Sequence, residues 1–172
     1  MKNTEIRFSR ALHERILADL RRPHPFAFER VGFARGVWEP EAHDANLILL
    51  SEYEPVSEEH YIDDPRVGVR INSDAIRNAM QTALDGRERG ICVFHVHLHD
   101  LGGRPMPSKV DAREIPPMIV SIARVSPQVP HGFLILSADS ASAWVNLAGS
   151  EDFQSAGVVV VGSPTYFGFP RL

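Results

Sequence analysis

The chain has 172 residues, of which 44% are hydrophobic and 23% are charged, a composition typical of a globular protein long enough to bury its own core. The formal net charge of -4 lacks the basic character that nucleic-acid binding needs. A single cysteine, Cys92, excludes an internal disulfide, and no stretch approaches the roughly 20 apolar residues of a membrane span. We expect one domain over residues 1–172, cytoplasmic, without a nucleic-acid or membrane partner. The oligomeric state stays open.

Hydrophobic periodicity predicts three helices and seven strands along the chain. Apolar residues recur at helical spacing in the segments 8–22, 73–85 and 108–125. Runs typical of strands occupy the segments 26–37, 46–53, 67–71, 91–99, 131–137, 143–147 and 157–161. The order α-β-β-β-α-β-α-β-β-β indicates a mixed α/β sheet with helices packed on it.

Several local features sharpen this outline. The segment 46–53 is apolar enough to be buried on both faces, and the strands at 131–137 and 143–147 are expected to form a hairpin. Ser73 is placed to cap the second helix, and the two prolines at 116–117 predict a kink or a break in the third. The acidic segment 55–65 is expected to be a solvated loop rather than a mobile flap.

Three histidines stand at alternate positions in the segment 91–99. Because a strand directs residues i, i+2 and i+4 to one face, His95, His97 and His99 form a row of imidazoles. The opposite face is apolar and carries Cys92, Phe94, Val96 and Leu98. Imidazole is a common zinc ligand, and a catalytic zinc site needs about three protein ligands with one open position. The row therefore predicts a metal site, with a polar exposed strand face as the alternative.

Two further positions complete the chemistry. Ser108 and Asp111 open the third helix, where the carboxylate would meet the end of the histidine strand and serve as a third ligand. Ser-x-x-Asp is also the sequence of a helix capping box, and a serine can cap a helix at the mouth of a metal site. Glu29, predicted to lie in a strand, is the candidate general base, and an exposed strand residue is the alternative.

Taken together, these pieces resemble the JAMM (MPN) metalloprotease family. Glu29, Gly32 and Gly36 match its Glu-x-x-Gly-x-x-x-Gly strand, the segment 91–99 carries its His-x-His pair, and the segment 108–111 matches its Ser-x-x-Asp. The resemblance covers about residues 8–165. It implies an MPN-like, cytidine-deaminase-like fold, in which a mixed β-sheet is flanked by helices.

The resemblance also implies a function. Asp111 and two histidines would hold Zn²⁺, Glu29 would activate the attacking water, and Ser108 would help to stabilise the oxyanion. The family cleaves peptide or isopeptide bonds, often after ubiquitin-like proteins, and its short prokaryotic members often accompany ubiquitin-like conjugation enzymes. A ubiquitin-like protein or its conjugates is therefore the implied substrate.

The chain departs from the family pattern in one spacing and in the residue after the second histidine, where the family usually has proline and this chain has Leu98 or Asp100, and the histidine pair is left open. Asp111 follows His99 by 12 positions and His97 by 14, where the family places its Asp about eleven positions after the second histidine. The shorter insertion favours His97 and His99, with His95 as an alternative ligand or an outer-shell group. Two other functions stay open: a catalytically inactive MPN-type scaffold or binding module, and a zinc hydrolase of small amides.

Overall fold

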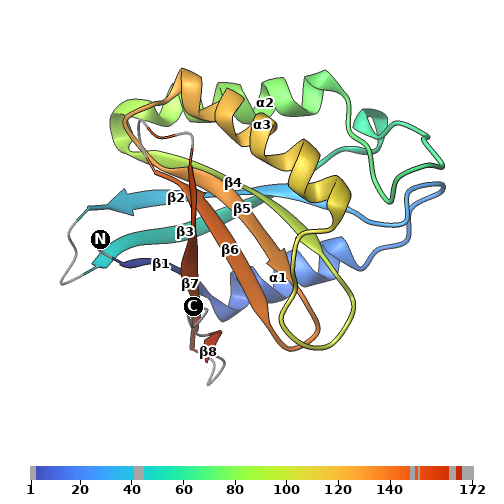
Figure 1. The fold of residues 1–172 in the computed structure, drawn as a ribbon, viewed down its shortest axis with the longest axis horizontal. Coiled ribbons are helices and arrows are strands. Elements are labelled where there is room, and N and C mark those ends of the chain that lie inside the picture. Colours follow the sequence, from blue (N-terminus) through green and yellow to red (C-terminus); the bar gives the residue numbers. More distant parts are fainter. Residues whose placement is uncertain (1–2, 41–44, 148–149, 151, 163–165, 168–172) are drawn as a thin grey trace.

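We describe the fold from a computed structural model, which covers residues 3–40, 45–147, 150, 152–162 and 166–167 (Figure 1). Three α-helices lie in this part of the chain: α1 (Arg10–Leu20), α2 (Ser73–Gly86) and α3 (Lys109–Val125). The strands are β1 (Asn3–Ser9), β2 (Val31–Glu39), β3 (Ala45–Pro55), β4 (Ile91–Leu98), β5 (His131–Leu136), β6 (Ala141–Asn146), β7 (Phe153–Val161) and β8 (Tyr166–Phe167). Two 3₁₀ helices span Glu58–His60 and Arg87–Arg89.

Strands β1 to β7 form a closed mixed sheet. Their order is β1-β3-β2-β4-β5-β6-β7, and β1 pairs with both β3 and β7, so the sheet closes into a barrel. The pairs β1–β3, β1–β7 and β4–β5 are parallel, the other pairs in the barrel are antiparallel, and β8 extends the sheet beyond β7. The predicted mixed α/β class is confirmed, whereas the sequence pattern does not predict the closure.

Closure depends on β1, a strand that the periodicity of the sequence does not reveal. Thr4, Ile6 and Phe8 are buried and alternate with more exposed residues. Ile6 is in register with Ile48 of β3 and with Val158 of β7. Two apolar residues in a seven-residue strand are too few to distinguish it from a helix start, so the predicted helix 8–22 absorbs its end.

The inside of the barrel and the inner face of α1 share one hydrophobic core. The helix contributes Leu12, Ile16 and Leu20, all buried. The strands contribute the apolar face of β4 predicted from the sequence, which is completely buried or nearly so: Cys92, Phe94, Val96 and Leu98. The row of imidazoles consequently faces away from the interior of the barrel.

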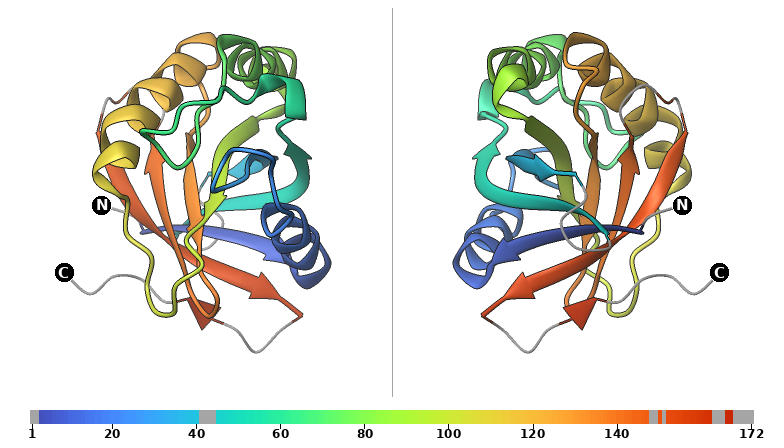
Figure 2. Two further views of the ribbon diagram at one scale, coloured as in Figure 1. Left: turned by 90° about the vertical axis from the view of Figure 1, so that its right-hand side faces the viewer. Right: turned by 90° about the vertical axis from the view of Figure 1, so that its left-hand side faces the viewer.

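The outer face of β4 and β5 is covered by α2 and α3, which lie side by side across it (Figures 1 and 2). Ile115, Ile119 and Ile122 of α3 pack there against Phe133 and Ile135 of β5. Helix α1 lies on the other side of the barrel from α2 and α3 (Figure 2). The histidine row thus lies on the covered side of the sheet, beneath the helix that begins next to it.

The helix starts follow the expected capping chemistry with one shift. Asn72, not Ser73, caps α2: its Oδ1 accepts the N–H groups of Asp74 and Ala75 at 3.0 and 3.1 Å. Of the predicted kink or break in α3, the break does not occur, because the helix runs without interruption from Lys109 through the prolines at 116–117 to Val125. Tertiary packing of the apolar face of α3 outweighs the two missing backbone donors.

Three strand predictions need correction, and the hairpin of β5 and β6 is confirmed. The segment 26–30 is a loop, and β2 begins only at Val31. The segment 67–71 contains only an isolated bridge between Tyr61 and Ile71. Strand β3 is not buried on both faces: Ile48 and Leu50 point inward, but Leu49 between them is 37% exposed. A barrel strand needs only one apolar face, and this accounts for the alternation in β3.

Residues 41–44, 163–165 and 168–172 lie outside the described part of the chain. None of the helices in the described ranges is long and apolar enough to span a bilayer.

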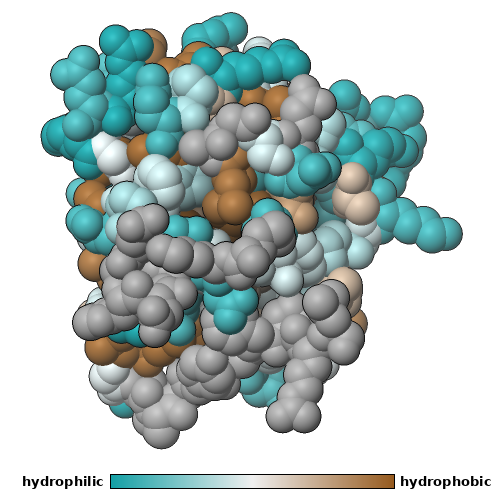
Figure 3. All heavy atoms as spheres, turned by 60° about the vertical axis from the view of Figure 1, so that its left-hand side comes forward, coloured by the Kyte–Doolittle hydropathy of each residue, from teal (hydrophilic) through white to brown (hydrophobic). Residues whose placement is uncertain are grey.

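The face in Figure 3 mixes hydrophilic and hydrophobic side chains, with hydrophilic ones frequent along the top, where α2 and α3 lie.

Candidate metal centre

Three of the predicted ligands converge where β4 ends and α3 begins. The Nε2 atoms of His97 and His99 lie 3.2 Å apart. Asp111 Oδ2 lies 3.6 Å from the first and 3.4 Å from the second. His97 is 1% exposed, and the side chains of His99 and Asp111 are 20% and 16% exposed. This largely buried His–His–Asp group could hold a metal ion.

The spacing of these three atoms fits zinc. Zinc binds histidine nitrogen and carboxylate oxygen at about 2.0–2.2 Å in tetrahedral geometry, which separates neighbouring ligand atoms by about 3.3–3.6 Å. The observed separations of 3.2, 3.4 and 3.6 Å match the edges of one such tetrahedron. Three protein ligands leave a fourth position for water or substrate, as in catalytic zinc sites.

Asp111 takes part in helix capping and in this group with the same oxygen. Its Oδ2 accepts the backbone N–H of Ser108 at 2.7 Å, and its own N–H donates to Ser108 Oγ at 3.1 Å, forming a complete capping box. The predicted capping box is therefore confirmed, and it holds the carboxylate toward the two imidazoles. Burial raises the pKa of Asp111, but His97 and the bonds from Ser108 outweigh this effect and keep the pKa well below its usual range.

His95 belongs to the row but not to the His–His–Asp group. Its ring centroid is 5.4 Å from that of His97, and its ring packs edge-on against Phe33. Burial, helped by His97, lowers the pKa of His95 to about 3, so the ring is neutral at physiological pH. The Nδ1 atoms of His95 and His97 are buried without a hydrogen-bond partner among the described residues.

Glu29 lies in the loop before β2, not in a strand as predicted. Phe28 fixes this loop to the segment before α2 by donating its N–H to Gly68 O at 2.8 Å, and Gly68 lies against the Glu29 carboxylate. Glu29 and His99 line the same open cleft, about 830 Å³ in volume. Burial raises the pKa of Glu29, while His97 and His99 act in the opposite direction. A carboxyl group with a raised pKa near the His–His–Asp group is suited to proton transfer.

An ion-pair network that the sequence gives no reason to expect, with the side chains of Arg30 and His24 buried and that of Glu58 half exposed, holds the Glu29 loop in place. The Arg30 side chain is 4% exposed, and its guanidinium donates to the carbonyls of Arg22 and Pro23 at 2.9 Å each. It also pairs with Glu58 Oε1 at 2.6 Å, and His24 Nε2 lies 2.9 Å from the other oxygen of that carboxylate. Glu58 of the acidic segment 55–65 therefore helps to hold the loop that carries Glu29.

The two glycines of the Glu-x-x-Gly-x-x-x-Gly match have structural explanations of their own. A Cβ at Gly32 would collide with the ring of Tyr53, and a Cβ at Gly36 would collide with the backbone carbonyl of Leu49. The β2–β3 register shifts between Arg35 and Gly36, which marks a bulge there. The close packing of β2 against β3 therefore requires these glycines independently of any role in the metal site.

Ser108 and Cys92 are placed as their sequence contexts indicate. Ser108 is exposed at the first turn of α3, and its Oγ acts in the capping box as an acceptor, so its hydroxyl hydrogen stays available to another group. Cys92 is completely buried, and burial raises the pKa of its thiol to about 12. A thiol of this kind is not a nucleophile at neutral pH.

Comparison with known proteins adds no relative. No protein-family model matches the chain, and no curated protein matches it by sequence.

Proposed function

We propose that the chain is a zinc-dependent peptidase of the JAMM type with an MPN-like fold, cleaving a peptide or isopeptide bond that follows a ubiquitin-like protein. The observation that carries the proposal is the convergence of His97, His99 and Asp111 at tetrahedral spacing beside a cleft that also contains Glu29. The match of these positions to the family pattern selects this reaction among those that zinc supports.

Zinc, when bound by these three residues, supplies a Lewis acid for the scissile carbonyl and lowers the pKa of water to about 7. Glu29 accepts a proton from the attacking water as its oxygen bonds to the carbonyl carbon. The same carboxyl group then donates that proton to the amide nitrogen as the carbon–nitrogen bond breaks, giving a carboxylic acid and an amine. The raised pKa of Glu29 suits both transfers, because the group must first bind the proton and then release it.

Ser108 has a second role in the proposed reaction, as a hydrogen-bond donor to the carbonyl oxygen. It is adjacent to Asp111 in the capping box and exposed, so its hydroxyl hydrogen can be donated to the carbonyl oxygen as negative charge develops there. The capping box fixes its Oγ by the bond from the Asp111 N–H, which reduces the reorganisation needed during the reaction.

The cleft supports a polypeptide substrate. Its volume of about 830 Å³ lies within the range of small-ligand pockets, so the support for a polypeptide comes from its exposed apolar lining. Phe28 and Leu101 line it and are 82% and 77% exposed, so apolar surface is available for contact next to His99 and Glu29. The identity of the substrate as a ubiquitin-like protein rests on the family resemblance.

The proposal is tested by turnover of a linear ubiquitin-like fusion with zinc-loaded protein. We expect cleavage at the end of the ubiquitin-like domain, loss of cleavage with a chelator, and loss with Glu29→Gln. Glu59→Gln is the matched control, because Glu59 is an exposed residue of the segment 55–65 and the substitution is the same. Equal turnover by Glu29→Gln and the wild type would refute the mechanism. Stoichiometric zinc without hydrolysis of any fusion would favour the scaffold instead.

A further inference from the structure

The loop that joins β4 to α3, residues 99–108, begins with one ligand of the His–His–Asp group and ends at the cap of the helix that carries another. No residue between His99 and Lys109 belongs to a helix or strand. Gly103, near the middle, has a φ of +87°, a left-handed conformation that favours glycine. The distance between the imidazole of His99 and the carboxylate of Asp111 therefore depends on what holds this loop.

The β5–β6 hairpin binds both main-chain polar groups of Gly103. The Gly103 N–H donates to Asp139 Oδ1 at 2.8 Å, and Ser137 Oγ donates to the Gly103 carbonyl at 2.8 Å. Ser137 is 3% exposed, and its Oγ accepts the Ser140 N–H at 3.0 Å. Of the acceptors within reach of its hydroxyl hydrogen, the Gly103 carbonyl at 2.8 Å is nearer than Ser140 O at 3.2 Å and Asp139 Oδ1 at 3.4 Å. A two-point contact to one residue fixes both its position and its orientation.

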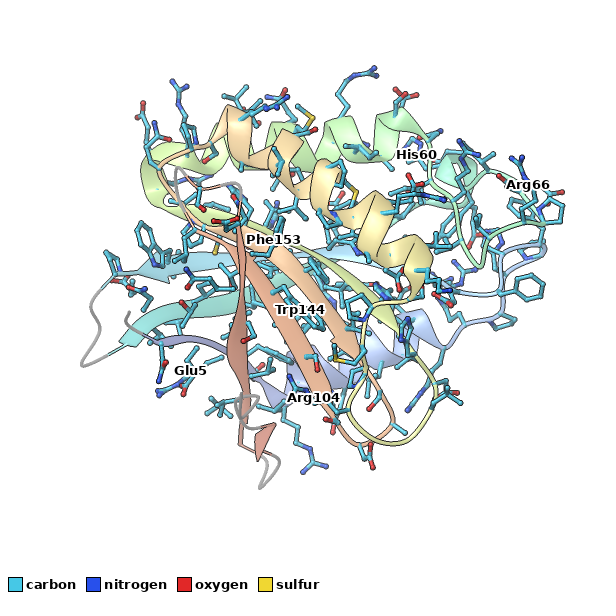
Figure 4. The ribbon with its side chains drawn as sticks, viewed as in Figure 1. Glu5, His60, Arg66, Arg104, Trp144 and Phe153 are labelled. Atoms are coloured by element: carbon cyan, nitrogen blue, oxygen red, sulfur yellow. The ribbon has the colours of Figure 1, made fainter. Side chains whose placement is uncertain are left out.

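Two more contacts hold the same loop against the same hairpin. His99 itself donates its N–H to the carbonyl of Leu136, at the end of β5, at 2.9 Å. Arg104, which follows Gly103, lies beside β6 with its Nε 3.4 Å from Ser142 Oγ (Figure 4). Figure 1 shows the loop and the turn between β5 and β6 running side by side at the end of the barrel. The hairpin thus lines the loop from its first residue to its middle.

We infer that Asp139 and Ser137 are positioning residues of the metal centre. By binding Gly103 they hold the 99–108 loop in the course that places His99 Nε2 3.4 Å from Asp111 Oδ2. Neither residue belongs to the His–His–Asp group, so they act through the loop backbone. The inference rests on the proposed function in taking this group to bind zinc.

Asp139 is the better residue for a test, because it is exposed and its replacement leaves no buried group of its own unpaired. Asp139→Ala removes the acceptor for the Gly103 N–H. Asp139→Asn is the matched variant, since it removes the same charge at the same place but keeps an acceptor oxygen. The pair separates the hydrogen bond to the loop from the general electrostatic attraction between a carboxylate and a cation.

The experiment measures zinc affinity of the full chain by competition with a chelating indicator, together with the visible absorption spectrum of the cobalt-substituted protein. We expect Asp139→Ala to bind zinc about tenfold more weakly, at the lower end of the effect of outer-shell partners, and to have an altered cobalt spectrum. Asp139→Asn is expected to stay close to the wild type in both readouts. Thermal unfolding without metal checks that both variants fold.

The outcomes are distinguishable. Wild-type affinity and spectrum for Asp139→Ala would overturn the inference and leave the proposed function standing. Equal weakening by Asp139→Ala and Asp139→Asn would also overturn it, because charge and not the contact with Gly103 would then be the cause. Failure of the wild type to bind zinc would overturn the proposed function and the inference together.

Discussion

The Nε2 atoms of His97 and His99 lie 3.2 Å apart, and both face the same oxygen of Asp111. Without a metal, two such nitrogens can share one hydrogen bond between neutral imidazoles. With zinc, the same separation is one edge of a coordination tetrahedron. Zinc binding through both Nε2 atoms therefore requires each ring to carry its hydrogen at Nδ1, a change of tautomer in the ring that donates the hydrogen bond and not a net release of a proton.

The ligand set predicts different results for the three histidines of the row. His97→Asn and His99→Asn should each weaken zinc binding by more than about a hundredfold, because outer-shell substitutions alone cost 10- to 100-fold. His95→Asn should retain stoichiometric zinc, since His95 lies outside the His–His–Asp group. Metal content measured after dialysis against a weak chelator separates these cases. Loss of zinc with His95→Asn but not with His99→Asn would show that the other pair binds the metal.

Replacing Glu29 should abolish most of the turnover without loss of the bound metal. Glu29→Gln should lower kcat by about 10²- to 10⁴-fold, the usual contribution of a general base, with zinc affinity close to the wild type. The active form of Glu29 is the carboxylate, and burial raises its pKa. The acidic limb of the pH–rate profile should therefore have its midpoint above the ordinary pKa of a glutamate. A limb that persists unchanged in residual Glu29→Gln activity would assign it to another group.

Protonation of His131 should destabilise the folded protein in acid, independently of the metal centre. Its Nδ1 accepts the Val93 N–H at 3.1 Å, its Nε2 lies 3.1 Å from Ser126 O, and burial lowers its pKa to about 4. His131 therefore becomes protonated near pH 6.5 in the unfolded chain but only near pH 4 in the folded chain. The contribution is complete above pH 6.5 and decreases by about 3 kcal/mol as the pH falls through this window.

Urea unfolding of the metal-free protein at several pH values measures this dependence. His131→Leu should be less stable than the wild type at pH 7.5, because it leaves the Val93 N–H unpaired, but its stability should change less between pH 6.5 and 4. Parallel curves for the two proteins would contradict the assignment of this window to His131.

Adding a single methyl group at Gly36 should cause a large loss of stability. A Cβ there collides with the backbone of β3, which cannot move without breaking the β2–β3 pairing, so Gly36→Ala should cost about 3 kcal/mol or more. Gly102→Ala is the control: the nearest atom to its Cβ would be Asp139 Oδ2 at 4.0 Å, and the change should stay within about 0.5 kcal/mol. Similar denaturation midpoints for the two variants would contradict this explanation of Gly36.

The sequence predicts the metal group better than its surroundings. The alternation of His95, His97 and His99 follows from strand geometry, and the capping box at 108–111 is local, so both are readable from spacing. The sequence identifies Glu29 as a candidate base but not its surroundings, because its loop is held by contacts with Gly68 and, through the neighbouring Arg30, with Glu58, both of them distant in the chain. Ion pairs between such segments leave no periodic signal.

The fold shows the same division. Helix faces and the β5–β6 hairpin have strong apolar patterns and are predicted, whereas β1 has only Ile6 and Phe8 and is missed. The barrel closes through β1, so its closure cannot be inferred without that strand. The prolines at 116–117 do not break α3, because the packing of its apolar face outweighs their local preference against a continuous helix.

Anomalous diffraction at the zinc absorption edge, from crystals grown with one equivalent of zinc, tests the central claim most directly. The account predicts one strong peak about 2.0–2.2 Å from His97 Nε2, His99 Nε2 and an Asp111 carboxylate oxygen, with Glu29 facing the remaining position. The absence of a peak at these atoms, or a peak bound by His95 in place of His99, would contradict it.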